Sequence, residues 1–336
     1  MPDQPLSSLA IIILTGHRSK HPRGTLLFFA RTMQYIWCMA INIEVTRDSS
    51  FCPGVDRAFK ITEQMLFGGK TRCYSIGPLI HNPEVVKRLG MLGLEVIDPD
   101  SEDLPDLAGM NVVIRSHGID TATEKKLESL GAVLVDATCP TVKRAQEAAS
   151  MLVELGYHPI VLGAASHPEV RSIVGRAGGP VTVLESVDEA KRWSDEHRGE
   201  ELKIGVVCQT TISRDLLEAV MAVLEQDFKD ITVMNTICES VSRRQEEANE
   251  MARSVDLMIV AGGRNSSNTA HLAQRCGEEC ANTRLIEDPS EIDCDWLQGV
   301  SSVGVTGGAS TPDWLIQETV EKLFELEQER EKKARG

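Results

Sequence analysis

The sequence is poor in aromatic residues and in basic charge, and both shortages exclude classes of partner. Phe, Trp and Tyr together make up 4% of the 336 residues, too few for a surface that stacks nucleobases. The chain has 35 Lys and Arg residues against 50 Asp and Glu residues, so its formal net charge is −15. Nucleic acids and anionic membranes attract basic surfaces, and we expect neither as a partner. An anionic small molecule stays open, because backbone dipoles can bind it locally.

Long apolar runs and nucleotide-binding loops are also lacking. No apolar run approaches the ~20 residues that a membrane-spanning helix needs. No G-x-G-x-x-G or Walker pattern follows a predicted strand. The sequence therefore predicts a soluble protein without a nicotinamide or nucleotide site of its own.

The nine cysteines are an odd number, spread widely along the chain. This is a poor match to the disulfide framework of a small secreted protein. We therefore expect a reducing, cytoplasmic location, where most thiols are core residues and a few are metal ligands.

The two ends of the chain differ from the rest in charge. Residues 1–38 hold four basic residues and one acidic residue. We expect them to be an N-terminal extension, either disordered or the result of a misplaced start, with the first domain beginning near Met39. Residues 327–336 are densely charged, and we expect a C-terminal tail that is the solvated end of a helix.

Between these ends, short β-branched runs alternate with longer amphipathic stretches. This pattern is typical of an α/β fold with parallel strands. The expected strands are 41–45, 72–76, 111–115, 132–136, 159–162, 204–208, 231–234, 257–261 and 303–305.

An internal repeat is centred on Cys52, Cys139 and Cys238. Each cysteine is followed by Val at the third and Arg at the fifth position, and each begins a helical stretch. The repeats are roughly one small α/β unit apart. Three such units in a pseudo-threefold arrangement would bring the three cysteines to one centre.

Unusual polar residues follow almost every predicted strand directly. They include His81, His117, His167, Glu169, Thr210, Ser266, Asn268 and Ser310. The carboxyl ends of parallel strands share one edge, which is where ligands bind in open α/β sheets. A single such residue would be read as a structural cap, but the whole set predicts an anion site. Glu169 is the one acidic residue in these motifs and is the candidate proton donor.

The three repeat cysteines are candidate metal ligands. A helix N-terminus favours the thiolate, the form that binds soft metals. Iron–sulfur clusters usually take four cysteines, so three would leave one iron open to a substrate. Other interpretations stay open at this point: buried cysteines without a ligand, a zinc module of three cysteines and a histidine, and a phosphatase with a cysteine nucleophile.

The motifs together resemble the 4-hydroxy-3-methylbut-2-enyl diphosphate reductases, the IspH or LytB family. The resemblance runs in order from about Met39 to Leu326. The matching segments are 51–58, 81–82, 116–118, 136–140, 167–170, 209–211, 237–238, 265–268 and 303–313.

The resemblance implies a trefoil of three small α/β domains with mostly parallel sheets around one iron–sulfur cluster. Residues 53–138 would form the first domain and 139–236 the second. Residues 39–52 and 237–326 together would form the third, which joins the two ends of the chain.

The resemblance also implies residue roles. Cys52, Cys139 and Cys238 would hold one [4Fe-4S] cluster, and Glu169 and Thr210 would lie at the hydroxyl end of the substrate. The residues implied for substrate binding are His81, His117, His167, Thr210, Ser266, Ser267, Asn268 and Ser310.

The implied reaction is the last step of the non-mevalonate isoprenoid pathway. A two-electron reductive dehydroxylation converts (E)-4-hydroxy-3-methylbut-2-enyl diphosphate to isopentenyl diphosphate and dimethylallyl diphosphate. The open iron would act as a Lewis acid towards the hydroxyl group, and Glu169 would serve the proton transfer. Ferredoxin or flavodoxin would supply the electrons.

Overall fold

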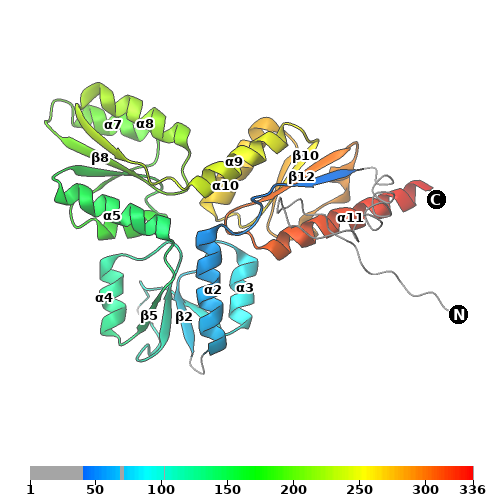
Figure 1. The fold of residues 1–336 in the computed structure, drawn as a ribbon, viewed down its shortest axis with the longest axis horizontal. Coiled ribbons are helices and arrows are strands. Elements are labelled where there is room, and N and C mark those ends of the chain that lie inside the picture. Colours follow the sequence, from blue (N-terminus) through cyan, green and yellow to red (C-terminus); the bar gives the residue numbers. More distant parts are fainter. Residues whose placement is uncertain (1–40, 69–71, 102, 336) are drawn as a thin grey trace, which may run out of the picture.

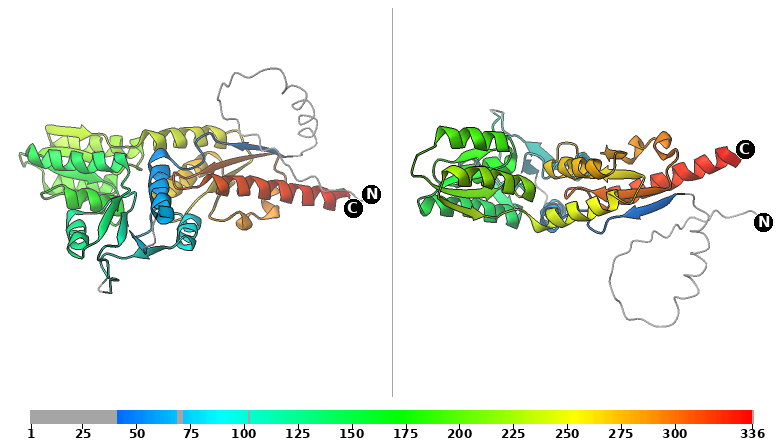
Figure 2. Two further views of the ribbon diagram at one scale, coloured as in Figure 1. Left: turned by 60° about the horizontal axis from the view of Figure 1, so that its bottom comes forward. Right: turned by 90° about the horizontal axis from the view of Figure 1, so that it is seen from above.

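The computed structural model describes residues 41–68, 72–101 and 103–335. Three four-stranded sheets with their helices lie around a common centre, like three leaves (Figure 1). The two further views show helix α11, in red, extending away from the centre of the molecule (Figure 2). The expected N-terminal extension, residues 1–38, lies outside the described residues.

All three sheets are parallel and share one strand order. The first sheet has the order β3-β2-β4-β5, the second β7-β6-β8-β9 and the third β11-β10-β12-β1. The strands are β1 Asn42–Val45, β2 Cys73–Ile76, β3 Leu94–Ile97, β4 Asn111–Ile114, β5 Val133–Asp136, β6 His158–Leu162, β7 Thr182–Leu184, β8 Lys203–Cys208, β9 Asp230–Met234, β10 Leu257–Ala261, β11 Thr283–Ile286 and β12 Ser302–Gly307.

Helices cover both faces of the sheets, and local sequence signals mark where they begin. Asn82, Asp120, Ser186 and Ser213 each cap a helix by accepting a backbone N–H bond. The helices are α2 Pro53–Gly68, α3 Pro83–Met91, α4 Thr121–Ser129, α5 Pro140–Glu154, α6 Pro168–Arg176, α7 Val187–Glu196, α8 Arg214–Asp227, α9 Glu239–Ala252, α10 Ser267–Glu279 and α11 Asp313–Arg335, with the 3-10 turns η1 Pro289–Glu291 and η2 Cys294–Leu297.

The third sheet takes strands from both ends of the described chain. β1 pairs with β12 in parallel, and Asn42 lies opposite Ser302. Each of the edge strands β1, β5 and β9 then leads to a cysteine at the start of a helix, α2, α5 or α9. These three helices begin near the centre of the trefoil (Figure 1).

The central strands are buried on both faces, which explains why the sequence predicts them well. In β10, Leu257, Ile259 and Ala261 pack into one apolar cluster with α11, and Met258 and Val260 pack into another with α9 and α10. Such strands form continuous apolar runs rather than an alternating pattern.

The nine expected strands are present, with ends within two residues of the prediction. The sequence missed β3, β7 and β11, which are one edge strand of each sheet. They are three or four residues long, and most of their side chains are partly or fully exposed. Where one domain ends and the next begins along the chain stays a prediction.

The expectation of a solvated tail from residue 327 is wrong at its start. Helix α11 continues to Arg335, as expected, but its charged run is not solvated from the first residue. Glu327 is 2% exposed and forms an ion pair with Arg330 at 3.2 Å, and Arg330 donates to the carbonyl of Leu297. The helix therefore packs on η2 for at least one turn of the charged run. Within the described ranges, no helix combines the length and the hydropathy needed to cross a bilayer.

Candidate active site at the centre of the trefoil

One cavity lies where the three leaves meet. All of the predicted site residues line it: Cys52, His81, His117, Cys139, His167, Glu169, Thr210, Cys238, Ser266, Ser267, Asn268 and Ser310. They come from all three sheets, which confirms that the pseudo-threefold arrangement brings distant motifs together.

The same backbone bond holds each of the three cysteines. The N–H of Cys52 donates to the carbonyl of Ala309 at 3.0 Å. The corresponding bonds run from Cys139 to Ser116 and from Cys238 to Thr210, both at 2.9 Å. Each acceptor lies just after a central strand. The repeat therefore fixes the cysteines against the loops that carry the polar residues.

Two of the three sulfur atoms lie close to Gly54. A Cβ atom at this position would lie 2.4 Å from Cys139 Sγ and 4.0 Å from Cys52 Sγ, so the close approach leaves room for glycine alone. None of the described cysteines forms a disulfide.

The expected lowering of thiol pKa values is wrong for Cys52. Burial raises the pKa of the Cys52 thiol, and the neighbouring Cys139 and Cys238 thiols raise it further. The Val55 N–H and the Arg244 guanidinium act in the opposite direction. Desolvation therefore outweighs the helix N-terminus in the absence of a ligand, and metal binding would release a proton here.

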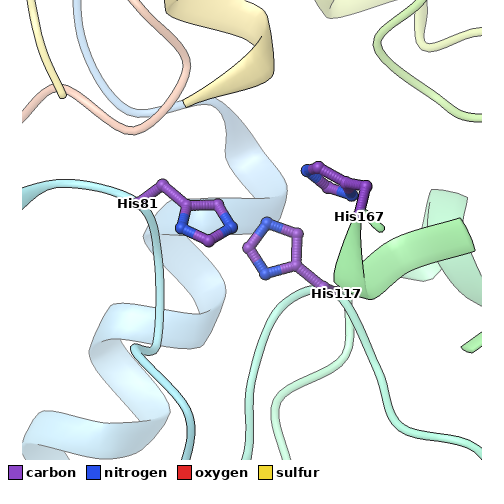
Figure 3. A group of neighbouring side chains, drawn as sticks. All are labelled: His81, His117 and His167. Atoms are coloured by element: carbon purple, nitrogen blue, oxygen red, sulfur yellow. The ribbon is translucent and has the colours of Figure 1, made fainter. Parts of the chain in front are cut away.

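Three histidine rings form one wall of the cavity (Figure 3). The ring centroids of His81 and His117 are 4.7 Å apart, those of His81 and His167 5.7 Å, and those of His117 and His167 5.3 Å. The rings come from the loops after β2 and β4 and from the start of α6.

These histidines are neutral at physiological pH. Burial lowers the pKa of all three rings, and it lowers that of His167 to about 4. The Arg115 guanidinium acts in the same direction on each. His167 Nδ1 accepts the N–H of Glu169 at 3.2 Å, so its proton is on Nε2. The wall therefore offers neutral hydrogen-bond donors that can gain charge when an anion binds.

Glu169 and Thr210 form a buried pair. Glu169 is 2% exposed, and its carboxyl group accepts the Thr210 N–H at 2.6 Å and the Thr210 hydroxyl at 3.1 Å. Burial raises the pKa of Glu169 to about 7, although both Thr210 bonds lower it. A carboxyl group with this pKa can hold or release a proton near neutral pH.

The start of α10 supplies the remaining donors. Ser266 caps the helix by accepting the Thr269 N–H at 3.3 Å, and its hydroxyl lies 3.5 Å from that of Ser310. Both amide atoms of Asn268 are buried without a partner. A helix N-terminus with free donors is a ready site for an anion.

The comparisons with known proteins identify the family. The family model described as LytB protein matches residues 43–324. The chain belongs to this LytB family.

LytB relatives match over nearly their whole length. The chain is 43% identical over 293 residues to the 4-hydroxy-3-methylbut-2-enyl diphosphate reductase of Geobacter metallireducens, covering 85% of this chain and 98% of that protein. It is 37% identical over 292 residues to the enzyme of the same name from Aquifex aeolicus, covering 85% and 97%.

Solved structures agree with the LytB assignment. One is described as (E)-4-hydroxy-3-methyl-but-2-enyl diphosphate reductase, the terminal enzyme of the non-mevalonate pathway. It matches with a TM-score of 0.63 at 36% identity, over 85% of this chain and 99% of that one. The E-1-hydroxy-2-methyl-but-2-enyl-4-diphosphate reductase from Plasmodium falciparum matches with a TM-score of 0.77 at 27% identity, over 84% and 87%. The fold is therefore the trefoil that the LytB resemblance implies.

The segment after Cys238 does not form the anion-binding loop of a phosphatase with a cysteine nucleophile. Arg244 stands six residues after Cys238, the spacing of a cysteine nucleophile and its anion-binding arginine. Residues 239–252 form a helix, however, and Arg244 donates to backbone carbonyls instead.

Sequence reasoning missed two arginines near the central cavity, of which Arg115 is partly buried and Arg244 is buried. Arg115, which follows β4, acts on all three histidines, and burial lowers its pKa to about 10. Arg244 lies beside the cysteines. The position of Arg115 next to Ser116 and His117 is a signal that could have identified it.

The other cysteines within the described residues lie elsewhere. Cys73 and Cys208 are buried strand residues, as expected, and Cys276 and Cys280 pack in the core between α9 and α10. Cys294 is exposed on η2.

Proposed function

We propose that the chain catalyses the reaction of its family in the central cavity: the two-electron reductive dehydroxylation of (E)-4-hydroxy-3-methylbut-2-enyl diphosphate to isopentenyl diphosphate and dimethylallyl diphosphate. The observation that carries the proposal is the shared cavity. Three convergent thiols, a wall of neutral histidines and one buried carboxyl group of raised pKa line the same space.

Cys52, Cys139 and Cys238 would hold one [4Fe-4S] cluster. This ligand set is supported by the position of all three cysteines on one cavity and by the space that Gly54 leaves beside Cys139 Sγ and Cys52 Sγ. Arg244, whose buried Nε has no partner, would add positive charge beside the thiolates that hold the cluster. When bound, such a cluster supplies electrons and a Lewis-acidic iron without a protein ligand.

The substrate diphosphate would bind between the histidine wall and the start of α10. His81, His117 and His167 offer ring N–H donors. Ser266, Ser267 and Ser310 offer hydroxyl groups, and the unpartnered Asn268 amide offers two more donors. This arrangement orients the anion without a lysine or arginine on the cavity wall.

The substrate hydroxyl would then lie near Glu169 and Thr210. A hydroxyl group leaves as water only when a proton reaches it. With a pKa of about 7, Glu169 can hold a proton near neutral pH, and the Thr210 hydroxyl, 3.1 Å away, can pass that proton on. The seclusion of this pair keeps bulk water from competing.

Ferredoxin or flavodoxin would deliver the electrons in the cytoplasm, because the sequence carries no nicotinamide or nucleotide motif. Purification under anaerobic conditions tests the whole proposal. We expect a brown protein with about four irons per chain that reduces the allylic diphosphate with a chemical reductant. A Cys139→Ser protein should lose both the colour and the turnover. A colourless wild-type protein that holds zinc would refute the proposal.

A further inference from the structure

The three helices that begin at the cysteines differ at one buried position. The sixth residue after the cysteine is Ala58 in α2 and Ala145 in α5, both fully buried. The corresponding residue in α9 is Arg244, which is 2% exposed. A cation therefore replaces a methyl group in one of three equivalent places and breaks the pseudo-threefold symmetry next to the cysteines.

The Arg244 guanidinium ties together the two segments that hold Cys52. One terminal nitrogen donates to the Ser50 carbonyl at 2.5 Å, two residues before Cys52. The other donates to the Gly307 carbonyl at 2.6 Å, two residues before Ala309. Ala309 in turn accepts the Cys52 N–H. We call these two guanidinium bonds the Arg244 fork. Loss of the fork would loosen Cys52 and the loop that carries Ser310 together.

The charge of Arg244 acts on two cysteines and on two carboxylates. Burial lowers the pKa of Arg244, and the groups that oppose this are Cys52, Asp48, Glu247 and Cys238, with Cys52 the strongest. Asp48 lies at the surface near Arg243, and Glu247 accepts the backbone N–H groups of Arg47 and Asp48. Nε of Arg244 is buried without a partner. A buried cation is costly unless an anion compensates it, and the thiolates of a cluster bound in this cavity would do so.

We propose that Arg244 is a positioning residue that anchors Cys52 and raises the reduction potential of the cluster. The inference rests on the proposed function, because it requires a cluster on the three cysteines. Each electron that an external carrier adds makes the cluster more negative. A fixed cation in a dry site stabilises the reduced form more than the oxidised form.

The test compares Arg244→Gln and Arg244→Lys with the matched control Arg243→Gln. Arg243 is the preceding residue of the same helix, carries the same charge and is exposed, at 3.9 Å from Asp48.

The readout is the midpoint potential of the purified holoenzyme without substrate, followed by electron paramagnetic resonance. For Arg244→Gln we expect at least a tenfold fall in the one-electron reduction equilibrium, a shift of about 59 mV to more negative potential. Arg244→Lys should shift by less than half as much, and Arg243→Gln should match the parent.

Iron loss to a chelator reports the anchoring separately. Both Arg244 variants should lose iron several-fold faster than the parent, because neither amide nor ammonium reproduces the fork, while Arg243→Gln should not. A parental potential in Arg244→Gln, or equal shifts in the Gln and Lys variants, would overturn the proposal. If Arg244→Gln fails to hold the cluster, the midpoint potential of Arg244→Lys decides between the outcomes. A tenfold fall in the reduction equilibrium of Arg244→Lys would overturn the proposal. A parent protein without a cluster would instead refute the proposed function itself.

Discussion

Among the described residues that line the cavity, Glu169 is the only carboxyl group. Its neighbours on the wall are neutral, so its own charge is set by burial and by the two bonds from Thr210. Burial dominates, and the carboxyl group is poised between acid and carboxylate at neutral pH. The residue can therefore serve as a proton source in a site that otherwise only donates hydrogen bonds.

Replacement of Glu169 by Gln keeps the size of the side chain and removes the exchangeable proton. We expect Glu169→Gln to assemble the cluster and bind substrate, with turnover reduced about 10²-fold or more. Because the pKa of Glu169 is raised to about 7, the acid form is lost as pH rises. In the parent, kcat/KM should fall as pH increases through about 7, and the variant should lack this limb. Near-normal turnover in the variant would remove Glu169 from the mechanism.

The histidine wall predicts that substrate binding takes up protons. Burial and Arg115 hold the pKa values of His81, His117 and His167 below their usual range in the free protein. A diphosphate in contact with the rings raises these values. Affinity should therefore weaken as pH rises through the pKa values of the bound state.

Calorimetry with the substrate in two buffers of different ionisation enthalpy measures this uptake. The observed binding enthalpy should change with the buffer in the parent, and the change should be smaller in His167→Asn. A binding enthalpy independent of the buffer would contradict the prediction.

At the scale of elements, the start of α2 is shaped by the cysteine of another unit. Ala is a better helix former than Gly, so Gly54→Ala would ordinarily stabilise an exposed helix. Here the new Cβ would lie 2.4 Å from Cys139 Sγ.

We expect Gly54→Ala to keep its fold by circular dichroism and to lose most of its iron. The control is Gly277→Ala in α10, where nothing lies within 4 Å, and its iron content should match the parent. Full iron in Gly54→Ala would show that the sulfur atoms do not need this space.

The element scale also explains what the sequence could predict. Central strands such as β10 are continuous apolar runs followed at once by polar loops, so both the strand and its functional residues stand out. The edge strands are different: β3 exposes Glu95 and Val96, and β11 exposes Arg284. Partial burial leaves a short and mixed pattern that resembles a loop.

At the scale of the whole molecule, the repeat of three cysteines was enough to predict one central site. It predicted the site because parallel strands bring their carboxyl ends to a common edge. It could not show Arg244 at that site, since a basic residue in a polar helix gives no sign that it is buried. Glu327 was missed for the same reason: its burial depends on η2, which is distant in sequence.

The pairing of β1 with β12 makes the trefoil depend on the first described strand. Residues 42–45 complete the third sheet, and the Thr46 hydroxyl lies 2.7 Å from that of Thr306 in the interior. The same segment leads to Cys52.

We therefore expect a chain that begins at Arg47 to melt at a lower temperature and to retain little iron. A chain that begins at Met39 keeps β1, and the composition of residues 1–38 predicts that it matches the full chain. Melting temperature, iron content and turnover of the three proteins provide the comparison. If the chain from Arg47 kept parental values, the closure of the third sheet would be dispensable. If the chain from Met39 lost stability, the preceding residues would be part of the folded protein.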